Sequence, residues 1–380
     1  MQKLAHKPDY VLITLFWIIV VFGLIMLSSA SSVLGYYTKG QDSYWYVKHQ
    51  LLFGFLPGAF FFYVMSRIDY RFWKRIAPLL FLFSIGLLGL VFIPGIGSTS
   101  GTNAKSWINI FGFSLQPAEI VKLTFLLYLS AWLERRREKV KDFAYGFLQF
   151  LIYLGLIATL VILQPDIGTV SIIIFTSIVV YYAAGAQISH LFLILIGAVA
   201  GFFALIKIAP YRLARLTAFL DPSADPQGVG YHIKQALLAV GSGGLLGLGL
   251  GQSKQKFQYL PEVAGDSIFA IMAEELGFII ITIFIVLFLA LFLRIIKVAS
   301  KTDDLFGHLV AVGVAVWILG QFFVNVGAML GILPLTGLPL PLVSYGGTAM
   351  MVTMAAVGIV VNISRQTQEG IVTKNIKNWK

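Results

Sequence analysis

Residues 267–293, SIFAIMAEELGFIIITIFIVLFLALFL, decide the fold class of this chain. The run exceeds the roughly 18 apolar residues that a helix needs to cross the ~30 Å hydrocarbon core of a membrane. Similar runs recur along nearly the whole length, and 58% of the 380 residues are hydrophobic while 12% are charged. The composition therefore predicts a polytopic helical membrane protein.

Ten apolar segments are long enough to be transmembrane helices. We predict them at 10–34, 45–65, 75–93, 117–133, 143–163, 167–184, 190–209, 267–294, 305–330 and 346–364. The first run resembles a secretory signal but is longer than a usual signal core, so we interpret it as a retained anchor. The fold prediction is one all-α integral membrane domain over residues 1–380.

The basic residues predict the orientation in the membrane. The net charge is +11, and most of the 28 Lys and Arg residues lie on one side of the membrane if the N-terminus is cytoplasmic. Cytoplasmic segments carry such an excess, so both termini are predicted to be cytoplasmic. We attribute the charge to topology and to attraction of anionic membrane lipids, not to nucleic-acid binding. The absence of cysteine excludes disulfides and thiolate metal sites.

One extracytoplasmic loop, between the seventh and eighth helices, is far longer than the others and covers residues 210–266. Residues 211–220 carry Arg212 and Arg215 among leucines, a basic amphipathic pattern suited to a membrane surface. Residues 231–240 predict a second short helix. The GSGGLLGLGLG run that follows lacks the phosphate-binding glycine patterns and favours close approach of the backbone to a helix or to lipid.

Four acids lie between positions 262 and 275 of this otherwise apolar region. Asp266 directly precedes the eighth span, so it is a candidate N-cap and also a candidate general base for a hydroxyl that arrives at the membrane surface. Glu274 and Glu275 lie within the membrane, where an acid must be paired, protonated or in contact with water. They mark either a structural bond or a polar pocket.

Proline-containing turns place further polar residues at predicted helix starts. Gln116 and Pro117 are the expected cap and first residue of the fourth span, which puts Glu119 in its first turn and Lys122 on the same face. There Lys122 could meet an acid or a phosphate. Asp166 is the expected cap of the sixth span.

The stretch LPLTGLPLPLVSYGGTAM, residues 333–350, holds three prolines and cannot be regular helix. Its carbonyls need protein or water around them, so we expect it to pack into an outer cavity. The five His residues show no metal-ligand spacing, and no Ser-His-Asp arrangement stands out.

At these residues the chain resembles the SEDS family of cell-wall polymerases. The resemblance covers almost all ten spans. Its motifs are SWI at Ser106, QPAE at Gln116, QPDIGT at Gln164, the GYH and GSGG region at Gly230, YLPE at Tyr259, EELG at Glu274 and PLPLVSYGG at Pro339. It implies polymerisation of lipid II into peptidoglycan strands. Asp266 would deprotonate the acceptor 4-hydroxyl, which attacks the donor anomeric carbon with inversion and displaces undecaprenyl pyrophosphate.

The positions above and the resemblance together give a set of candidate substrate-binding residues. They are Lys105, Trp107, Gln116, Glu119, Lys122, Asp166, Arg212, Arg215, Lys254, Lys256, Glu262, Glu274, Glu275 and Ser344. Cations among them are expected to meet the pyrophosphate, and a divalent cation, Mg²⁺ or Mn²⁺, could assist. No other cofactor is expected.

The chain departs from the family pattern at one place. Many relatives carry a His-Thr pair directly before the acid, whereas Ala264 and Gly265 stand there in this chain, so no adjacent His can tune Asp266. The run GLGLGQSKQKFQYLPE is more similar to the division type, FtsW, than to the elongation type, RodA.

The resemblance also implies partners and a location. A class B penicillin-binding protein transpeptidase and other division or elongation proteins are the expected partners. The expected location is the bacterial cytoplasmic (inner) membrane, with the active site on the extracytoplasmic side. Two other functions stay open at this point, a lipid II flippase and a division scaffold without turnover.

Overall fold

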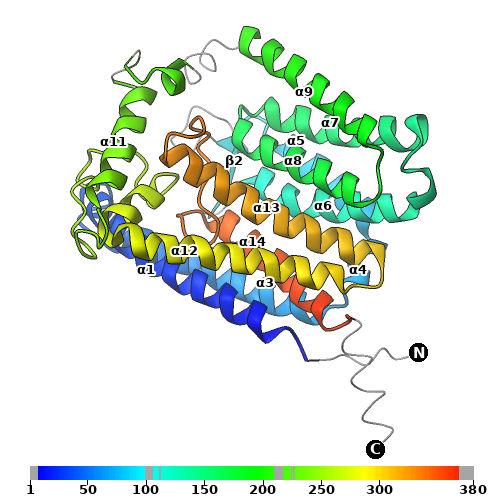
Figure 1. The fold of residues 1–380 in the computed structure, drawn as a ribbon, viewed down its shortest axis with the longest axis horizontal. Helices are drawn as coiled ribbons and strands as arrows, with labels where there is room; N and C mark the ends of the chain where they lie inside the picture. The colour runs from blue at the N-terminus through cyan, green and yellow to red at the C-terminus, as the bar shows by residue number, and fades with distance from the viewer. Residues whose placement is uncertain are drawn as a thin grey trace, which may run out of the picture.

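The computed structural model describes residues 7–98, 106–110, 113–208, 217–223, 225 and 227–367. Most of these residues are helical, and the helices form one elongated bundle in which most axes run roughly parallel to the long dimension (Figure 1). The prediction of an all-α polytopic membrane protein is confirmed.

A helix occupies each of the ten predicted spans. These helices are α1 (Tyr10–Thr38); α2 (Trp45–Gln50), continued by the π-helical η1 (Leu51–Phe55) and by α3 (Leu56–Arg67); α5 (Ala77–Leu90); α6 (Pro117–Arg135); the π-helical η3 (Phe143–Leu148), continued by α7 (Gln149–Ile162); α8 (Ile167–Ala183); α9 (Ile188–Ile208); α12 (Ile268–Ser300); α13 (Leu305–Met329); and α14 (Gly347–Ser364). Three shorter elements are α4 (Arg71–Arg75), the 3-10 helix η2 (Arg137–Lys139) and α11 (Val229–Ser242). The predicted short helix at 231–240 is therefore confirmed as α11.

Six helical segments among the described residues are long and apolar enough to cross a membrane. They are α1, the continuous segments 45–67 and 143–162, α12, α13 and α14, while α5, α8 and the first part of α9 are shorter apolar helices. Helix α6 carries four charged residues along its length and is less apolar than the others. The count of ten spans and the side on which each end lies stay predictions.

A small antiparallel sheet between α5 and α6 was not predicted. It consists of β1 (Gly97–Ser98), β2 (Trp107–Ile110) and β3 (Phe113–Leu115), in the order β1-β2-β3. Trp107 pairs with Ser98 across the first two strands. Strands of two to four residues are too short to show a clear period-two pattern in the sequence.

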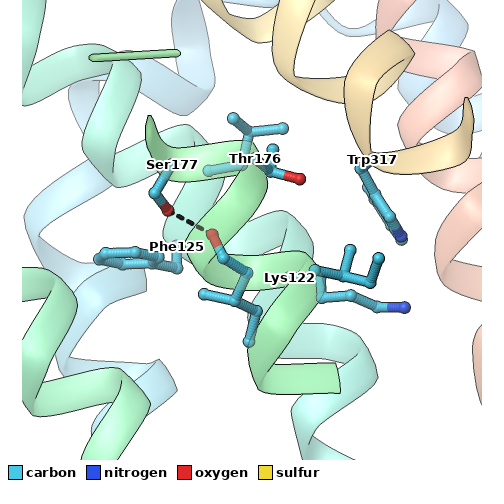
Figure 2. Close-up of a pocket in the computed structure, with 8 residues that line it drawn as sticks. Lys122, Phe125, Thr176, Ser177 and Trp317 are labelled. Carbon is cyan, nitrogen blue, oxygen red and sulfur yellow. Dashed lines mark hydrogen bonds between the residues drawn. The ribbon is translucent and has the colours of Figure 1, made fainter. Parts of the chain in front are cut away.

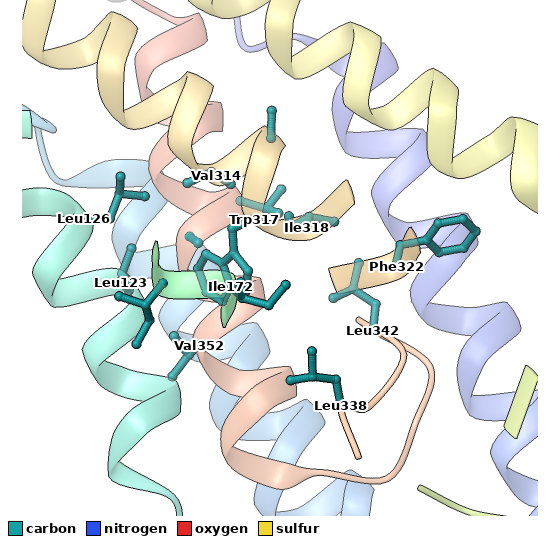
Figure 3. Close-up of a cluster of buried hydrophobic side chains, with 14 of the residues drawn as sticks. Leu123, Leu126, Ile172, Val314, Trp317, Ile318, Phe322, Leu338, Leu342 and Val352 are labelled. Atoms are coloured by element: carbon teal, nitrogen blue, oxygen red, sulfur yellow. The ribbon is translucent and has the colours of Figure 1, made fainter. Parts of the chain in front are cut away.

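The core surrounds Trp317 of α13, one of the largest fully buried side chains. Figure 3 shows Leu126 of α6, Ile172 of α8, and Leu338 and Leu342 of the loop after α13 in the same cluster. This loop is the proline-containing stretch predicted to pack into a cavity, and its buried leucines confirm that it packs against protein. This loop therefore contacts both the buried core and the turn that precedes α12.

Glycines bring α14 and α3 into close contact. A Cβ atom on Gly358 would lie 2.6 Å from the Phe62 carbonyl oxygen, and one on Gly58 would lie 2.5 Å from Met354 Sδ. Small residues at such crossings let helix backbones approach within a membrane, where van der Waals packing largely drives association.

Helix α12 is kinked at Gly277, whose φ of 73° and ψ of 177° are not helical. The glycine-rich loop after α11 lies in this kink, because Phe278 N donates to the Gly244 carbonyl at 2.9 Å and Leu248 N donates to the Glu274 carbonyl at 3.0 Å. A Cβ on Gly277 would lie 2.2 Å from Gly247 N. The predicted close approach of the glycine run is therefore made to a helix, and the loop satisfies backbone groups that the kink frees.

The first and last helices meet at the end of the bundle opposite α11 (Figure 1). Asp9 caps α1 by accepting from Leu12 N at 3.0 Å and pairs with Arg294 Nε of α12 at 2.7 Å. The Asp9 amide donates to Ser364 Oγ at the end of α14 at 3.1 Å. The candidate site lies at the other end of the bundle, near α11, where α12 begins.

Candidate active site

Asp266 lies in the turn that leads into α12. The expectation that Asp266 caps this helix is wrong, because α12 begins at Ile268 and its cap position is Ser267, with no side-chain cap bond. The cause is a tight turn around Glu262, which has a φ of 51° and accepts from Gly265 N at 2.9 Å and from Ser267 N at 3.2 Å. The Asp266 carboxylate is therefore not used as a helix cap.

Three donors hold the backbone that carries Asp266. Ser344 Oγ donates to the Gly265 carbonyl at 2.6 Å, and Tyr345 N donates to the Ala264 carbonyl at 2.8 Å. Asn325 Nδ2 of α13 donates to the Asp266 carbonyl at 2.7 Å. The proline-containing loop and α13 thus clamp the turn from two sides, and the predicted site residue Ser344 acts in this clamp.

The side chain of Asp266 is half-buried among polar groups. Ser267 Oγ donates to Asp266 Oδ1 at 3.3 Å, and His232 Nε2 of α11 lies 2.6 Å from the same Ser267 Oγ. Sequence reasoning found no His next to Asp266 in the chain, and the structure brings one from α11. The GYH motif held this residue, but nothing in its spacing shows which residue of α12 it meets.

The Glu262 carboxylate lies near Asp266 and His232. Partial desolvation and the negative charge of Asp266 raise the pKa of Glu262 above its ordinary value, while His232 lowers it. Glu262 as a whole is solvent-exposed, but its carboxyl group faces the turn near Gly265, and this group is the part that is desolvated. Two acids and one His therefore meet at the start of α12.

Glu274 and Glu275 are buried and make structural bonds. Glu274 accepts from Lys254 N at 3.0 Å and also from the Ser253 hydroxyl. Glu275 pairs with Lys256 Nζ at 2.9 Å, and the two side chains are 0% and 3% exposed. Of the two possibilities left open by the sequence, the geometry favours the structural bond.

Glu119 and Lys122 form a second buried ion pair, at 2.8 Å, on one face of α6. Lys122 Nζ also donates to Gln321 Oε1 at 2.8 Å and lies 4.9 Å from the centre of the Trp317 ring. Gln321 Nε2 donates in turn to the Pro339 carbonyl at 2.8 Å. The pair therefore supports the same loop that clamps Asp266.

A small recess lies beside Lys122, between α6, α8 and α13. Figure 2 shows Phe125, Thr176, Ser177 and Trp317 around it, with the Ser177 hydroxyl bonded to the backbone of its own helix. Most of its lining is apolar. None of the residues that line the recess belongs to the turn of Asp266.

Asn325 and Gln321 were missed by sequence reasoning. They lie four residues apart on α13, hence on one face, in the otherwise apolar part of the helix that follows His308. Polar residues inside a membrane span are costly unless paired, so this spacing was the available signal.

The other predicted site residues lie on structural contacts. Gln116 precedes α6 as predicted, and its Nε2 donates to Asp166 Oδ2 at 3.0 Å. Asp166 caps α8 by accepting from Thr169 N at 2.9 Å, as predicted. Trp107 lies in β2, and Lys254 is exposed although its backbone N–H donates to Glu274.

Some candidate ligands of a phosphate or a metal cannot be placed. Lys105, Arg212 and Arg215 lie outside the described residues. Among the residues that are described, no group of three His, Asp or Glu side chains is arranged to hold a metal ion. The possible divalent cation thus stays a prediction.

Comparison with known proteins gives one family. The model of the FtsW, RodA and SpoVE family, described as cell cycle protein, matches residues 9–369. The chain is 42% identical over 363 residues to stage V sporulation protein E of Bacillus subtilis, covering 95% of this chain and 98% of that protein. It is 38% identical over 356 residues to a probable peptidoglycan glycosyltransferase FtsW of Geobacter sp., covering 94% and 96%.

Two solved structures are similar over nearly the whole chain. One belongs to a peptidoglycan synthase complex described for its coordination of polymerization and crosslinking, with a TM-score of 0.77, 26% identity and coverage of 94% of this chain and 98% of that one. The other is the rod shape determining protein RodA of Thermus thermophilus, with a TM-score of 0.69, 27% identity and coverage of 95% and 98%.

Proposed function

Because this chain belongs to the FtsW, RodA and SpoVE family, we propose that it is a peptidoglycan glycosyltransferase that polymerises lipid II into glycan strands. Relatives named as probable peptidoglycan glycosyltransferases support the reaction class. The proposed location is the bacterial cytoplasmic membrane, with the α11 end of the bundle on the extracytoplasmic side.

The clamped, half-buried Asp266 is the observation that carries the mechanism. Asp266 takes the proton of the acceptor 4-hydroxyl, and the electron pair of that oxygen forms the bond to the donor anomeric carbon. The bond from this carbon to the pyrophosphate breaks, and undecaprenyl pyrophosphate leaves as an anion. A single displacement inverts the anomeric carbon, and no carboxylic acid is needed to protonate such a leaving group.

A fixed backbone suits this role, because a base must lie within hydrogen-bond reach of the proton it removes. The bonds from Asn325, Ser344 and Tyr345 hold the turn of Asp266 against α13 and the loop after it. A substrate with a polar sugar and a long lipid tail would meet the base at the membrane surface.

The pyrophosphate requires cations near the base. Lys122 and Lys256 are buried in ion pairs with Glu119 and Glu275, so we leave them out of the proposed pyrophosphate site. Lys254, together with Lys105, Arg212 and Arg215, stays as its candidate set. We propose no metal-dependent step.

A transpeptidase partner of the class B penicillin-binding type is part of the proposal. The synthase complex with a similar chain, described for polymerization and crosslinking, supports it. The division type is proposed over the elongation type, since the Geobacter relative named FtsW is 38% identical whereas the RodA structure is 27% identical.

The test is polymerisation of lipid II in detergent by the purified full chain with its partner protein, comparing wild type with Asp266→Asn. Asn keeps an oxygen that can accept from Ser267 Oγ, so the fold should survive while the base is lost. We expect the variant to lose a factor of roughly 10²–10⁴ in rate. Asp42→Asn, in an exposed ion pair with Lys48, is the matched control and should keep the wild-type rate.

The same assay separates the competing functions. Detergent leaves no second compartment, so a flippase or a scaffold would form no polymer. Absence of polymer from wild type, or an equal amount from Asp266→Asn, would overturn the proposal.

A further inference from the structure

The residues that flank Asp266 in the chain differ in what they can offer its carboxylate. Ala264 and Gly265 have no polar side chain. Ser267, on the other side, is fully buried, and its hydroxyl contacts both Asp266 Oδ1 and His232 Nε2. The three side chains therefore form a line from α11 to the carboxylate.

The number of protons that each group can donate determines which group is the donor in each of these two hydrogen bonds. An ionised carboxylate can only accept, and a serine hydroxyl has one proton to donate. Ser267 therefore donates to Asp266, and His232 must donate to Ser267 through a protonated Nε2. Each bond polarises the next, so the line stabilises the ionised Asp266 and resists rotation of its carboxylate.

We infer that His232 is a positioning residue that acts on Asp266 through Ser267. It orients the base toward the acceptor hydroxyl, and in this chain it supplies from α11 what the Ala264-Gly265 pair cannot. The inference rests on the proposed role of Asp266 as the base.

The start of α11 is built to hold His232 in place. The Asp225 carboxylate accepts from Gly228 N at 3.0 Å and from Val229 N at 2.8 Å at the start of the helix. A Cβ on Gly230 would lie 2.3 Å from the Pro222 carbonyl oxygen, so the turn before α11 packs closely on its first residues. His232 lies one turn into the helix, so the contacts that fix the start of α11 also fix the position of His232.

Attachment of α11 to the bundle does not depend on the His232 bond. Ile233, Ala236 and Ala239 of α11 are buried, and the loop after α11 is bonded to the kink of α12. Loss of the imidazole should therefore change stability little. A role in positioning and a role in holding α11 thus predict different results.

The charged environment of His232 includes groups from two sides. Glu262 and Asp266 lie on the turn before α12, and the interaction of Glu262 with His232 is attractive when the ring is charged. Lys234 lies on α11 itself. The direction of the hydrogen bonds is the same for the neutral ring with Nε2 protonated and for the charged ring.

The experiment compares His232→Phe, His232→Gln, Ser267→Ala and the double variant His232→Phe/Ser267→Ala in the full chain with its partner. Lipid II polymerisation gives kcat and KM, and thermal unfolding in detergent gives stability. We expect His232→Phe to lower kcat roughly tenfold to hundredfold with little change in KM or unfolding temperature. Gln should restore most of the rate, because its amide can donate to Ser267.

The double variant tests the line itself. If His232 acts through Ser267, the double variant should be no slower than the slower single variant. Ser242→Ala, which removes a hydroxyl bonded only within α11, is the matched control and should keep the wild-type kcat.

Three results would overturn the inference. They are a wild-type kcat in His232→Phe, a loss of kcat that follows a loss of stability and is not restored by Gln, and multiplicative losses in the double variant. Asp266→Asn measured in parallel separates the two proposals. If Asp266→Asn is inactive while His232→Phe is normal, only the positioning role fails, whereas an active Asp266→Asn refutes the base itself.

Discussion

The buried pair of Lys256 and Glu275 makes a quantitative prediction about stability. Lys256→Met keeps much of the side-chain volume but leaves the Glu275 carboxylate with Ser29 Oγ at 2.6 Å and Ser253 N at 3.4 Å as its donors. Removing one partner of a buried ion pair costs about 3–5 kcal/mol.

Two further variants make this prediction specific. Lys256→Met combined with Glu275→Gln removes both charges, and we expect it to recover to within about 1–2 kcal/mol of wild type. Lys254→Met changes an exposed lysine two residues away and should shift stability by less than about 0.5 kcal/mol.

The assay is thermal unfolding of the purified full chain in detergent, with midpoints compared at one heating rate because unfolding can be irreversible. The expected order is Lys256→Met lowest, the double variant intermediate or equal to wild type, and Lys254→Met equal to wild type. Equal midpoints for the two single lysine variants, or a double variant as unstable as Lys256→Met, would refute the reasoning.

Three other changes have defined outcomes. Gly277→Ala should destabilise the protein by at least about 2 kcal/mol, because its φ of 73° disfavours Ala and the new Cβ would lie 2.2 Å from Gly247 N; an unchanged unfolding midpoint would contradict this. Asn325→Leu should cost about 1–3 kcal/mol and slow lipid II polymerisation, since the Asp266 carbonyl loses its donor; a wild-type rate would mean that this bond does not position the base. The folded protein raises the pKa of Glu262 above its ordinary value of 4.5 because it disfavours the ionised carboxylate, so the stability of the wild type should fall as pH rises from about 4.5 through the raised pKa. Glu262→Gln should remove this loss of stability at higher pH and change stability little below pH 4.5. Parallel profiles of stability against pH for the two proteins would argue against this prediction.

The candidate site was only partly predictable. Asp266 and Ser344 could be named from the motifs of the sequence, and Asp166 could be identified as a helix cap from its position before an apolar run. The prediction that Asp266 is a cap was wrong, because the turn around Glu262 moves the start of α12 to Ile268. A positive φ at a non-glycine residue is imposed by its surroundings and has no local sequence signal.

By itself the sequence determined that the chain crosses a membrane repeatedly and where its helices lie. Within lipid every backbone N–H and C=O must be satisfied inside the segment, so a long apolar run forms a helix whatever its neighbours are. That requirement is local, and helices at all ten predicted spans agree with it. The tertiary structure alone decided which polar groups meet: Lys256 with Glu275, Asn325 with the Asp266 carbonyl, and His232 with Ser267. These partners are 19 to 59 residues apart in the chain, and only the packing of α11, α12 and α13 brings them within hydrogen-bond distance.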